Sequence, residues 1–212
     1  MVWQPYVVRQ GDYLTSLAYR SGTDADTIWK DPQNADLSAS RESYDMLCPG
    51  DLVYLPESPP EEPPAIEGGT NNELSAEVPK VELKLTFVGF DDAPLADADY
   101  VVEGGVATPP EGQTSKEGTV TLEVPVTLRE FQISFPNHGL THIIQIGHLD
   151  PPTEDSGVRQ RLINLGYLTP ETELDEDCVA AAVWQFQALH ELEATGRIDD
   201  GTRDKLVEVH GV

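Results

Sequence analysis

The chain has 212 residues, of which 38 are Asp or Glu and 13 are Lys or Arg, and its formal net charge is −25. This length suits two or three compact units, and 39% hydrophobic residues are enough to build cores. Such an acidic chain repels phosphate backbones and anionic lipids, which argues against nucleic acid and membrane surfaces as partners.

Neither a membrane span nor an export signal is predicted. No apolar run approaches the ~18 residues needed to cross a bilayer. The N-terminal stretch "MVWQPYVV" lacks the basic-then-apolar layout of a signal peptide. We therefore expect a soluble chain that is cytoplasmic, that reaches the cell envelope or the outside through a machine other than the general export route, or that has been trimmed by processing.

Residues 1–57 are predicted to form a small mixed unit with the order strand, helix, helix, strand. An extended segment at 6–9 is followed by a Gly-Asp turn and by helically spaced apolar residues from Leu14 onward. Thr23 and Asp26 approximate a capping box, which predicts the start of the second helix. The stretch "CPGDLVYLP" closes the unit with a turn and a strand.

A Pro- and Glu-rich stretch follows, and we predict that residues 58–79 form a linker. The sequence "PESPPEEPPAIEGGTNNELSAEVPK" contains glutamates without counter-charges and a Gly-Gly pair. This composition cannot build a core and favours extended, polyproline-like chain. We therefore expect a tether, with the first unit folding independently of the rest.

Residues 80–149 show the periodicity of strands. Apolar residues alternate in "VELKLTFVGF", "GTVTLEVPV" and "FQISF", and Gly, Pro and Asp turns separate these segments. Four or more short strands of this kind predict a small antiparallel β-sandwich. With "PLADADYVV" and "TSKEGTVTLEVP", the segment resembles the transthyretin-like modules that bacteria append to surface and secreted proteins. The resemblance implies a spacer.

The period then changes from two to 3.6, which predicts three helices in residues 150–212. Ser156 is a candidate cap for the first helix, and Gly166 is a stop signal. Acidic residues at 175–177 favour the start of a second helix, and a third helix is expected near Asp199. The second helix carries an apolar stripe of Val179, Ala182, Val183, Phe186 and Leu189.

The order of motifs in residues 6–56 resembles the lysin-motif (LysM) family. The pattern Y-V-V-x-x-G-D-x-L-x-x-L-A is followed by N-x-x-L and then by P-G-D-x-V-x-L-P. The residues in the family's order are Gly11, Asp12, Leu14, Asn34, Pro49, Gly50, Asp51 and Pro56. The resemblance implies a βααβ fold with a shallow groove that binds N-acetylglucosamine-containing glycans, such as peptidoglycan or chitin.

The same resemblance implies which residues line that groove. The candidates are Gly11, Asp12, Leu14, Asn34, Pro49 and Gly50. Tyr13, which replaces the small hydroxyl residue usual in the family, falls on a groove wall, as does the long segment 38–47. The alternative interpretation is that most of these residues simply make the fold, since Gly and Pro set turns and Leu14 belongs to a core.

Residues 155–210 resemble the three-helix peptidoglycan-binding domain found beside cell-wall hydrolases. The matching elements are V-x-x-x-L-x-x-L-G-Y, A-V-x-x-F-Q and T-G-x-x-D-x-x-T-x-x-x-L, whereas the usual D-G-x-[FY]-G is replaced by "LTPETELDEDC". The residues in family positions are Gly166, Tyr167, Phe186, Gln187, Gly196 and Thr202. Tyr167 and Trp184 are the candidate glycan contacts. Trp184 falls off the apolar stripe, so it is either an exposed ring that stacks on sugar or a further core residue.

No catalytic signature is found. The chain has no G-x-S-x-G, no H-E-x-x-H and no phosphate-cradling glycine loop. His138, His142 and His148 form the one cluster with the residue types of a metal or proton-relay site, and the even spacing of His142 and His148 would let them share a strand face. A zinc site would need further ligands, so surface and edge histidines are the preferred interpretation. Cys48 and Cys178 have no metal or disulfide spacing and are expected to be buried free thiols.

The sequence therefore predicts a non-catalytic, multidomain α+β protein that engages peptidoglycan and needs no cofactor. The combination of modules looks like proteins of bacteria encoded beside contractile injection machinery of the type VI or phage-tail kind. One alternative is a protein-binding adaptor or loading factor of such a machine, in which the LysM-like groove grips protein rather than glycan. Another is a catalytic role in which the histidine cluster binds metal.

Overall fold

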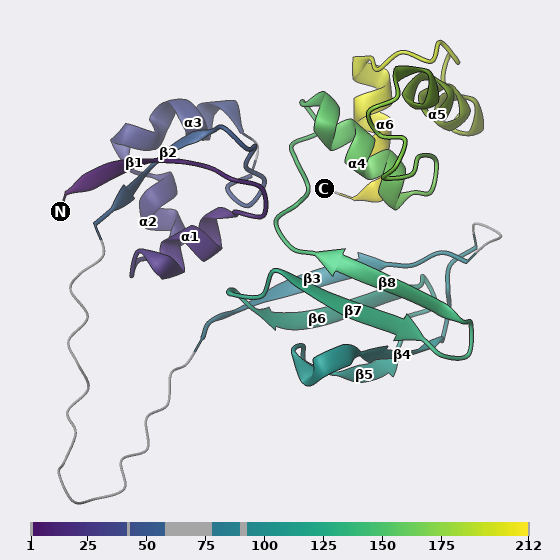
Figure 1. Cartoon of the computed structure of the whole chain (residues 1–212), viewed down its shortest axis with the longest axis horizontal. Coiled ribbons are helices and arrows are strands. Elements are labelled where there is room, and N and C mark those ends of the chain that lie inside the picture. The colour runs from purple at the N-terminus through teal and green to yellow at the C-terminus, as the bar shows by residue number, and fades with distance from the viewer. Residues whose placement is uncertain (1, 42, 58–77, 90–92, 212) are drawn as a thin grey trace, which may run out of the picture.

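The fold is mixed α+β, with antiparallel sheets and a C-terminal helical region (Figure 1). The structure is a computed structural model that describes residues 2–41, 43–57, 78–89 and 93–211. We name three parts of the chain: the N-terminal region (2–57), the central β-region (78–149) and the C-terminal helical region (150–211).

Two strands close the N-terminal region, and helices lie between them. Strand β1 (Trp3–Val7) pairs antiparallel with β2 (Leu52–Pro56), so the two ends of the region lie side by side. The helices between them are α1 (Leu14–Arg20), α2 (Ala25–Trp29), the 3₁₀ turn η1 (Pro32–Asn34) and α3 (Ala35–Ser40). Their apolar side chains and those of the strands share one core, which includes the fully buried Leu14, Ile28 and Val53.

Two details of this region differ from the sequence prediction. Helix α3 is additional to the expected two helices. The cap of α2 is Asp24, whose carboxylate accepts a hydrogen bond from the backbone N–H of Thr27 at 2.8 Å. The predicted capping pair, Thr23 and Asp26, was therefore wrong. Asp24 has extended backbone angles, which let its side chain reach the third N–H of the helix.

The central β-region consists of two antiparallel sheets. Strand β3 (Lys80–Thr86) pairs with β6 (Thr119–Pro125). The second sheet has the order β5-β4-β7-β8, made of β5 (Glu111–Gln113), β4 (Asp99–Val102), β7 (Glu130–Phe135) and β8 (Leu140–Gln145), with η2 (Glu103–Gly105) after β4. Leu122 from the first sheet and Ile133 and Phe135 from the second are fully buried in one shared core. The predicted antiparallel strands are confirmed, and the likeness to transthyretin stays a prediction.

The three predicted helices of the C-terminal helical region are confirmed. They are α4 (Asp155–Asn164), α5 (Glu176–Leu189) and α6 (Asp200–His210). Asp175 caps α5 by accepting hydrogen bonds from the N–H groups of Asp177 and Cys178, and Gly166 adopts φ +80° just after α4. Ser156 lies inside α4 instead of capping it, because the helix already begins at Asp155.

The predicted linker at 58–79 lies, except for its last two residues, outside the described part of the chain. None of the helices in the described ranges has both the length and the apolar character that a bilayer span requires.

Candidate functional site

One buried amide holds the loop between α5 and α6. Gln187 is fully buried, and its Nε2 donates to the carbonyl oxygen of Arg197 at 2.9 Å and to Thr202 Oγ1 at 2.8 Å. Its Oε1 accepts the backbone N–H groups of Thr195 and Gly196, each at 2.9 Å. Because both ends of the amide are satisfied, the loop is fixed against α5.

An exposed aromatic ring lies beside that loop. Trp184 on α5 is 54% exposed, whereas Phe186, two residues later, is fully buried. Gly196 has φ +70°, and a Cβ there would lie 3.0 Å from the carbonyl oxygen of Ala180 and 3.7 Å from Trp184 Cβ. Glycine therefore lets the loop backbone approach the helix beside the indole. Trp184 has open apolar surface, and its contact with a sugar stays a prediction.

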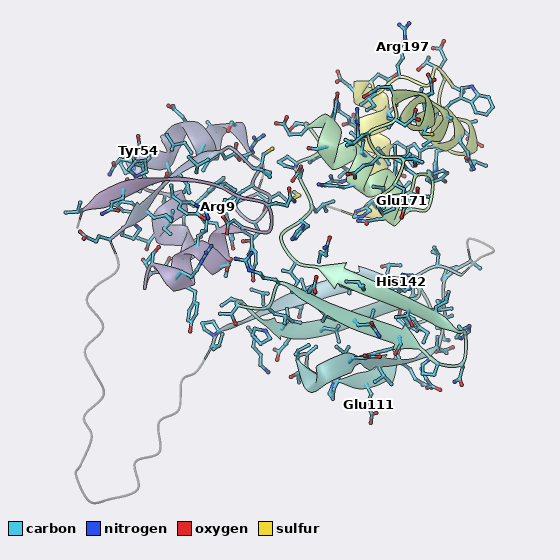
Figure 2. The ribbon with its side chains drawn as sticks, in the orientation of Figure 1. Arg9, Tyr54, Glu111, His142, Glu171 and Arg197 are labelled. Carbon is cyan, nitrogen blue, oxygen red and sulfur yellow. The ribbon has the colours of Figure 1, made fainter. Side chains whose placement is uncertain are left out.

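Arg197 adds a cation to the loop between α5 and α6, and the sequence prediction did not single it out. It directly follows Gly196, and its side chain is exposed and projects away from the helical region (Figure 2). The signal that could have found it is a lone basic residue in "TGRIDD", next to the glycine of the family pattern. The aromatic ring suits the apolar face of a ligand, and the guanidinium suits an anionic group.

Tyr167, the second candidate of this region, is partly buried at the edge of the core. Its ring packs edge-to-face on Phe186, with centroids 5.5 Å apart, and its Oη lies 3.3 Å from His190 Nε2. Burial, together with the charge of Lys205, lowers the pKa of His190 below its ordinary value, so this imidazole is neutral at pH 7. The contacts of Tyr167 are those of a residue that closes the core.

Leu14 and Asn34, two of the predicted groove residues, are buried inside the N-terminal region. Leu14 is fully buried in the core of that region. Asn34 donates from Nδ2 to the carbonyl oxygens of Ile28 and Tyr54, each at 2.9 Å, and its Oδ1 accepts the N–H of Tyr54 at 2.7 Å. These bonds tie η1 to α2 and β2, so both residues serve the fold.

Asp12 is also buried, and it holds the turn after β1. Its Oδ2 accepts Tyr6 Oη at 2.7 Å and the N–H of Arg9 at 3.0 Å, and its Oδ1 pairs with Arg20 Nη2 at 2.7 Å. Burial alone would raise the pKa of Asp12, but the hydrogen bonds from Tyr6, Arg9 and Arg20 hold it below its ordinary value. The carboxylate is therefore fully engaged within the region.

Gly11 and Tyr13 face the central β-region. A Cβ at Gly11 would lie 2.9 Å from His148 Nε2. Tyr13 is 6% exposed, and its ring belongs to the core of the central β-region. The N-terminal region therefore contacts the rest of the chain directly, which differs from the expectation of an independent first unit.

Pro49 and Gly50 are the predicted groove residues of the N-terminal region that face solvent. Both are exposed in the turn before β2. Gly50 has φ +101°, and a Cβ at this position would meet no atom within 4 Å. This turn is therefore open to a ligand, whereas the turn after β1 is covered.

The histidines are separated. Gly147, with φ +74°, turns the chain after β8, so His142 and His148 do not share a strand face, and that prediction was wrong. The ring of His142 lies 5.4 Å from that of Phe87, and His138 lies in the turn between β7 and β8. Among the described residues, no group of three or more His, Cys, Asp or Glu is placed to hold a metal ion.

The two cysteines are free thiols, as predicted, but each is only partly buried. Burial raises the pKa of Cys48, and the charges of Asp150 and Glu154 raise it further. The Cys48 thiol is therefore protonated at pH 7 and lies within the electrostatic reach of the C-terminal helical region.

Comparison with known proteins bears on the C-terminal helical region. Residues 156–206 match the family model described as a putative peptidoglycan binding domain. No curated protein and no solved structure matches the chain. The segment that carries Trp184 and Arg197 is therefore similar to a peptidoglycan-binding domain, which supports peptidoglycan as a partner of this protein.

Proposed function

We propose that the chain is a non-catalytic protein that binds peptidoglycan through its C-terminal helical region. The observation that carries the proposal is the exposed indole of Trp184 within the matched segment 156–206. A tryptophan ring offers a rigid apolar surface on which the face of a sugar ring can stack. Arg197 supplies a cation for the carboxylates of the peptide stem.

Retention on purified insoluble peptidoglycan tests this proposal. The substitution Trp184→Ala should weaken retention about 10-fold, which corresponds to about 1.4 kcal/mol. The matched control is Leu189→Ala, which removes an exposed apolar side chain from the same helix and should retain the unmodified affinity. Equal retention of the Trp184→Ala variant and the unmodified chain would refute the role of this surface.

The N-terminal region is proposed as a second, LysM-like glycan module, joined through the linker and a transthyretin-like spacer. Its support is the motif order in residues 6–56 and the exposed turn at Pro49 and Gly50. Two weak modules on one chain bind an insoluble glycan mesh more tightly than either alone, because the second binds at a high effective concentration.

A second candidate function is a protein-binding adaptor or loading factor of a contractile injection machine. One observation favours it: the turn after β1, which the resemblance assigns to glycan, contacts protein in this structure, namely the central β-region. If the chain is an adaptor that does not bind glycan, neither its N-terminal region nor its C-terminal helical region should be retained on insoluble peptidoglycan.

A further inference from the structure

The contact between the turn after β1 and the central β-region is closely packed. Tyr13 Oη donates to the carbonyl oxygen of Val126 at 2.9 Å, in a buried hydrogen bond. The ring of Tyr13 lies in the same apolar cluster as Phe131 and Ile146. An aromatic side chain from the N-terminal region thus completes a core that otherwise belongs to the two sheets.

The backbones of the two regions also approach each other closely at Gly11 and Gly147. A Cβ at Gly147 would lie 2.9 Å from the carbonyl oxygen of Gly11 and 2.9 Å from Tyr13 Cδ1. Gln10 Nε2 donates to the carbonyl oxygen of His148 at 3.1 Å. Glycine at 147 therefore permits an approach of the two backbones that a side chain would oppose.

A second contact joins the N-terminal region to the C-terminal helical region. Arg41 makes a bidentate pair with Asp51, at 3.0 and 2.7 Å, and its Nη1 reaches Glu154 at 2.9 Å. The side chains of Arg41 and Asp51 are only 12% and 13% exposed, so this pair is largely shielded from solvent. Because Glu154 precedes α4, the bridge spans both regions.

Arg161 extends this second contact into the interior. Its guanidinium is fully buried and donates to the carbonyl oxygens of Asp150 and Gly157 at 2.8 and 2.9 Å. Its Nη2 lies 3.7 Å from Met46 Sδ, in the segment before β2. The N-terminal region thus contacts the rest of the chain at two places. One contact is the buried ring of Tyr13, and the other is the ion pair between Arg41 and Glu154.

From these contacts we infer that the chain folds into a closed form that masks its own LysM-like groove. The inference rests on the proposed glycan binding by the N-terminal region. Gly11 and Tyr13, on one wall of that groove, are covered by the central β-region, whereas Pro49 and Gly50 stay open. Glycan must displace the central β-region before it can occupy the groove. The surface around Trp184 therefore binds glycan first, and the N-terminal region binds glycan only after its contact with the central β-region has opened.

Population arithmetic gives the size of the effect. The apparent affinity of a masked site is its intrinsic affinity multiplied by the fraction of open molecules. If roughly one molecule in ten is open, release of the contact raises the apparent affinity of the N-terminal region about 10-fold.

The closed form is tested first by small-angle scattering from the full chain. Tyr13→Ser removes the buried aromatic ring, and Glu154→Arg places a cation against Arg41 without changing a core residue. Both variants should have a larger radius of gyration than the unmodified chain. The matched control is Glu176→Arg, which makes the same charge change and breaks the pair with Arg159 inside the helical region. It should leave the radius unchanged.

The consequence for binding is tested on insoluble peptidoglycan in a Trp184→Ala background, so that the N-terminal region dominates retention. Tyr13→Ser and Glu154→Arg should each raise retention about 10-fold, and Glu176→Arg should not. Circular dichroism melts check that each variant is folded. Agreement between the two opening variants excludes an effect of the lost Tyr13 core contact alone.

The outcomes separate this inference from the proposed function. An unchanged radius of gyration in both opening variants and in the double variant Tyr13→Ser/Glu154→Arg, which removes both contacts, overturns the closed form, whatever binds. Expansion without any gain in retention, while the chain with Trp184 intact is retained, overturns the masking. If the opening variants expand but neither they nor the unmodified chain is retained on peptidoglycan, the proposed glycan binding is refuted. The masking, which rests on that binding, is then refuted as well.

Discussion

The N-terminal region, proposed to be a LysM-like module, and the C-terminal helical region, which contains the segment similar to a peptidoglycan-binding domain, present their aromatic residues in opposite ways. Tyr13 is 6% exposed and packs into the central β-region, whereas Trp184 is 54% exposed on α5. The difference teaches that a motif of this kind specifies a turn and a core. Whether the surface around it is free for a ligand depends on neighbours that are distant in sequence.

The same comparison shows what the two motifs share. In each region one buried amide fastens a loop: Asn34 bonds to Ile28 and Tyr54, and Gln187 bonds to the loop after α5. A side-chain amide has both donors and an acceptor, so it can replace several backbone partners at once. Both amides are buried, so their hydrogen bonds hold the fold of the loop that each one contacts.

The largest expected effect separates core from ligand surface within α5. Phe186→Ala should destabilise the C-terminal helical region by about 4 kcal/mol, because it opens a cavity where the ring is now fully buried. Trp184→Ala should cost less, about 1 kcal/mol, since more than half of the side chain is already exposed. Chemical denaturation followed by circular dichroism measures both. Similar losses in the two variants would contradict the assignment of Trp184 to a ligand surface.

An intermediate effect is expected at Asp12, where the N-terminal motif residue is structural. Asp12→Asn should cost about 1–2 kcal/mol, because the charge-assisted bonds from Tyr6 and Arg20 are weakened. The pKa of Asp12 lies below its ordinary value of 3.8, so its stabilisation is present above that pH and is lost as the pH falls through the folded-state value. Acid titration of unfolding should therefore be flatter in the variant. An unchanged acid profile would show that Asp12 is not engaged as described.

The smallest expected effect concerns Arg197, the exposed cation in the loop after α5. Arg197→Ala should weaken retention on peptidoglycan two- to fivefold, because an exposed charge contributes less than about 1 kcal/mol. The salt dependence of retention should also decrease in this variant, since one screened ion pair is lost. Arg203→Ala is a useful contrast, because Arg203 already pairs with Asp155 inside the region. If both arginine variants lose retention equally, Arg197 has no special part in the surface.

Much of the secondary structure could be predicted from periodicity and capping. Alternation in 80–86 and 119–125 marks β3 and β6, and the acidic residues at 175–177 mark the start of α5. Helix α3 was missed because it is short and continues from a 3₁₀ turn. The prediction that His142 and His148 share a strand face failed because Gly147 turns the chain after β8, before His148. Of the candidate site, the sequence left Trp184 as either an exposed ring or a core residue, and the structure exposes it.

By itself, the sequence determined the antiparallel strands, the three C-terminal helices and the similarity of the last segment to a peptidoglycan-binding domain. These features depend on local periodicity, caps and turns, which neighbouring residues encode. Only the tertiary structure decided that Tyr13 belongs to the core of the central β-region and that Arg41 bridges Asp51 and Glu154. The Tyr13–Val126 and Arg41–Glu154 contacts join residues 113 positions apart, and their geometry exists only once the regions have packed together.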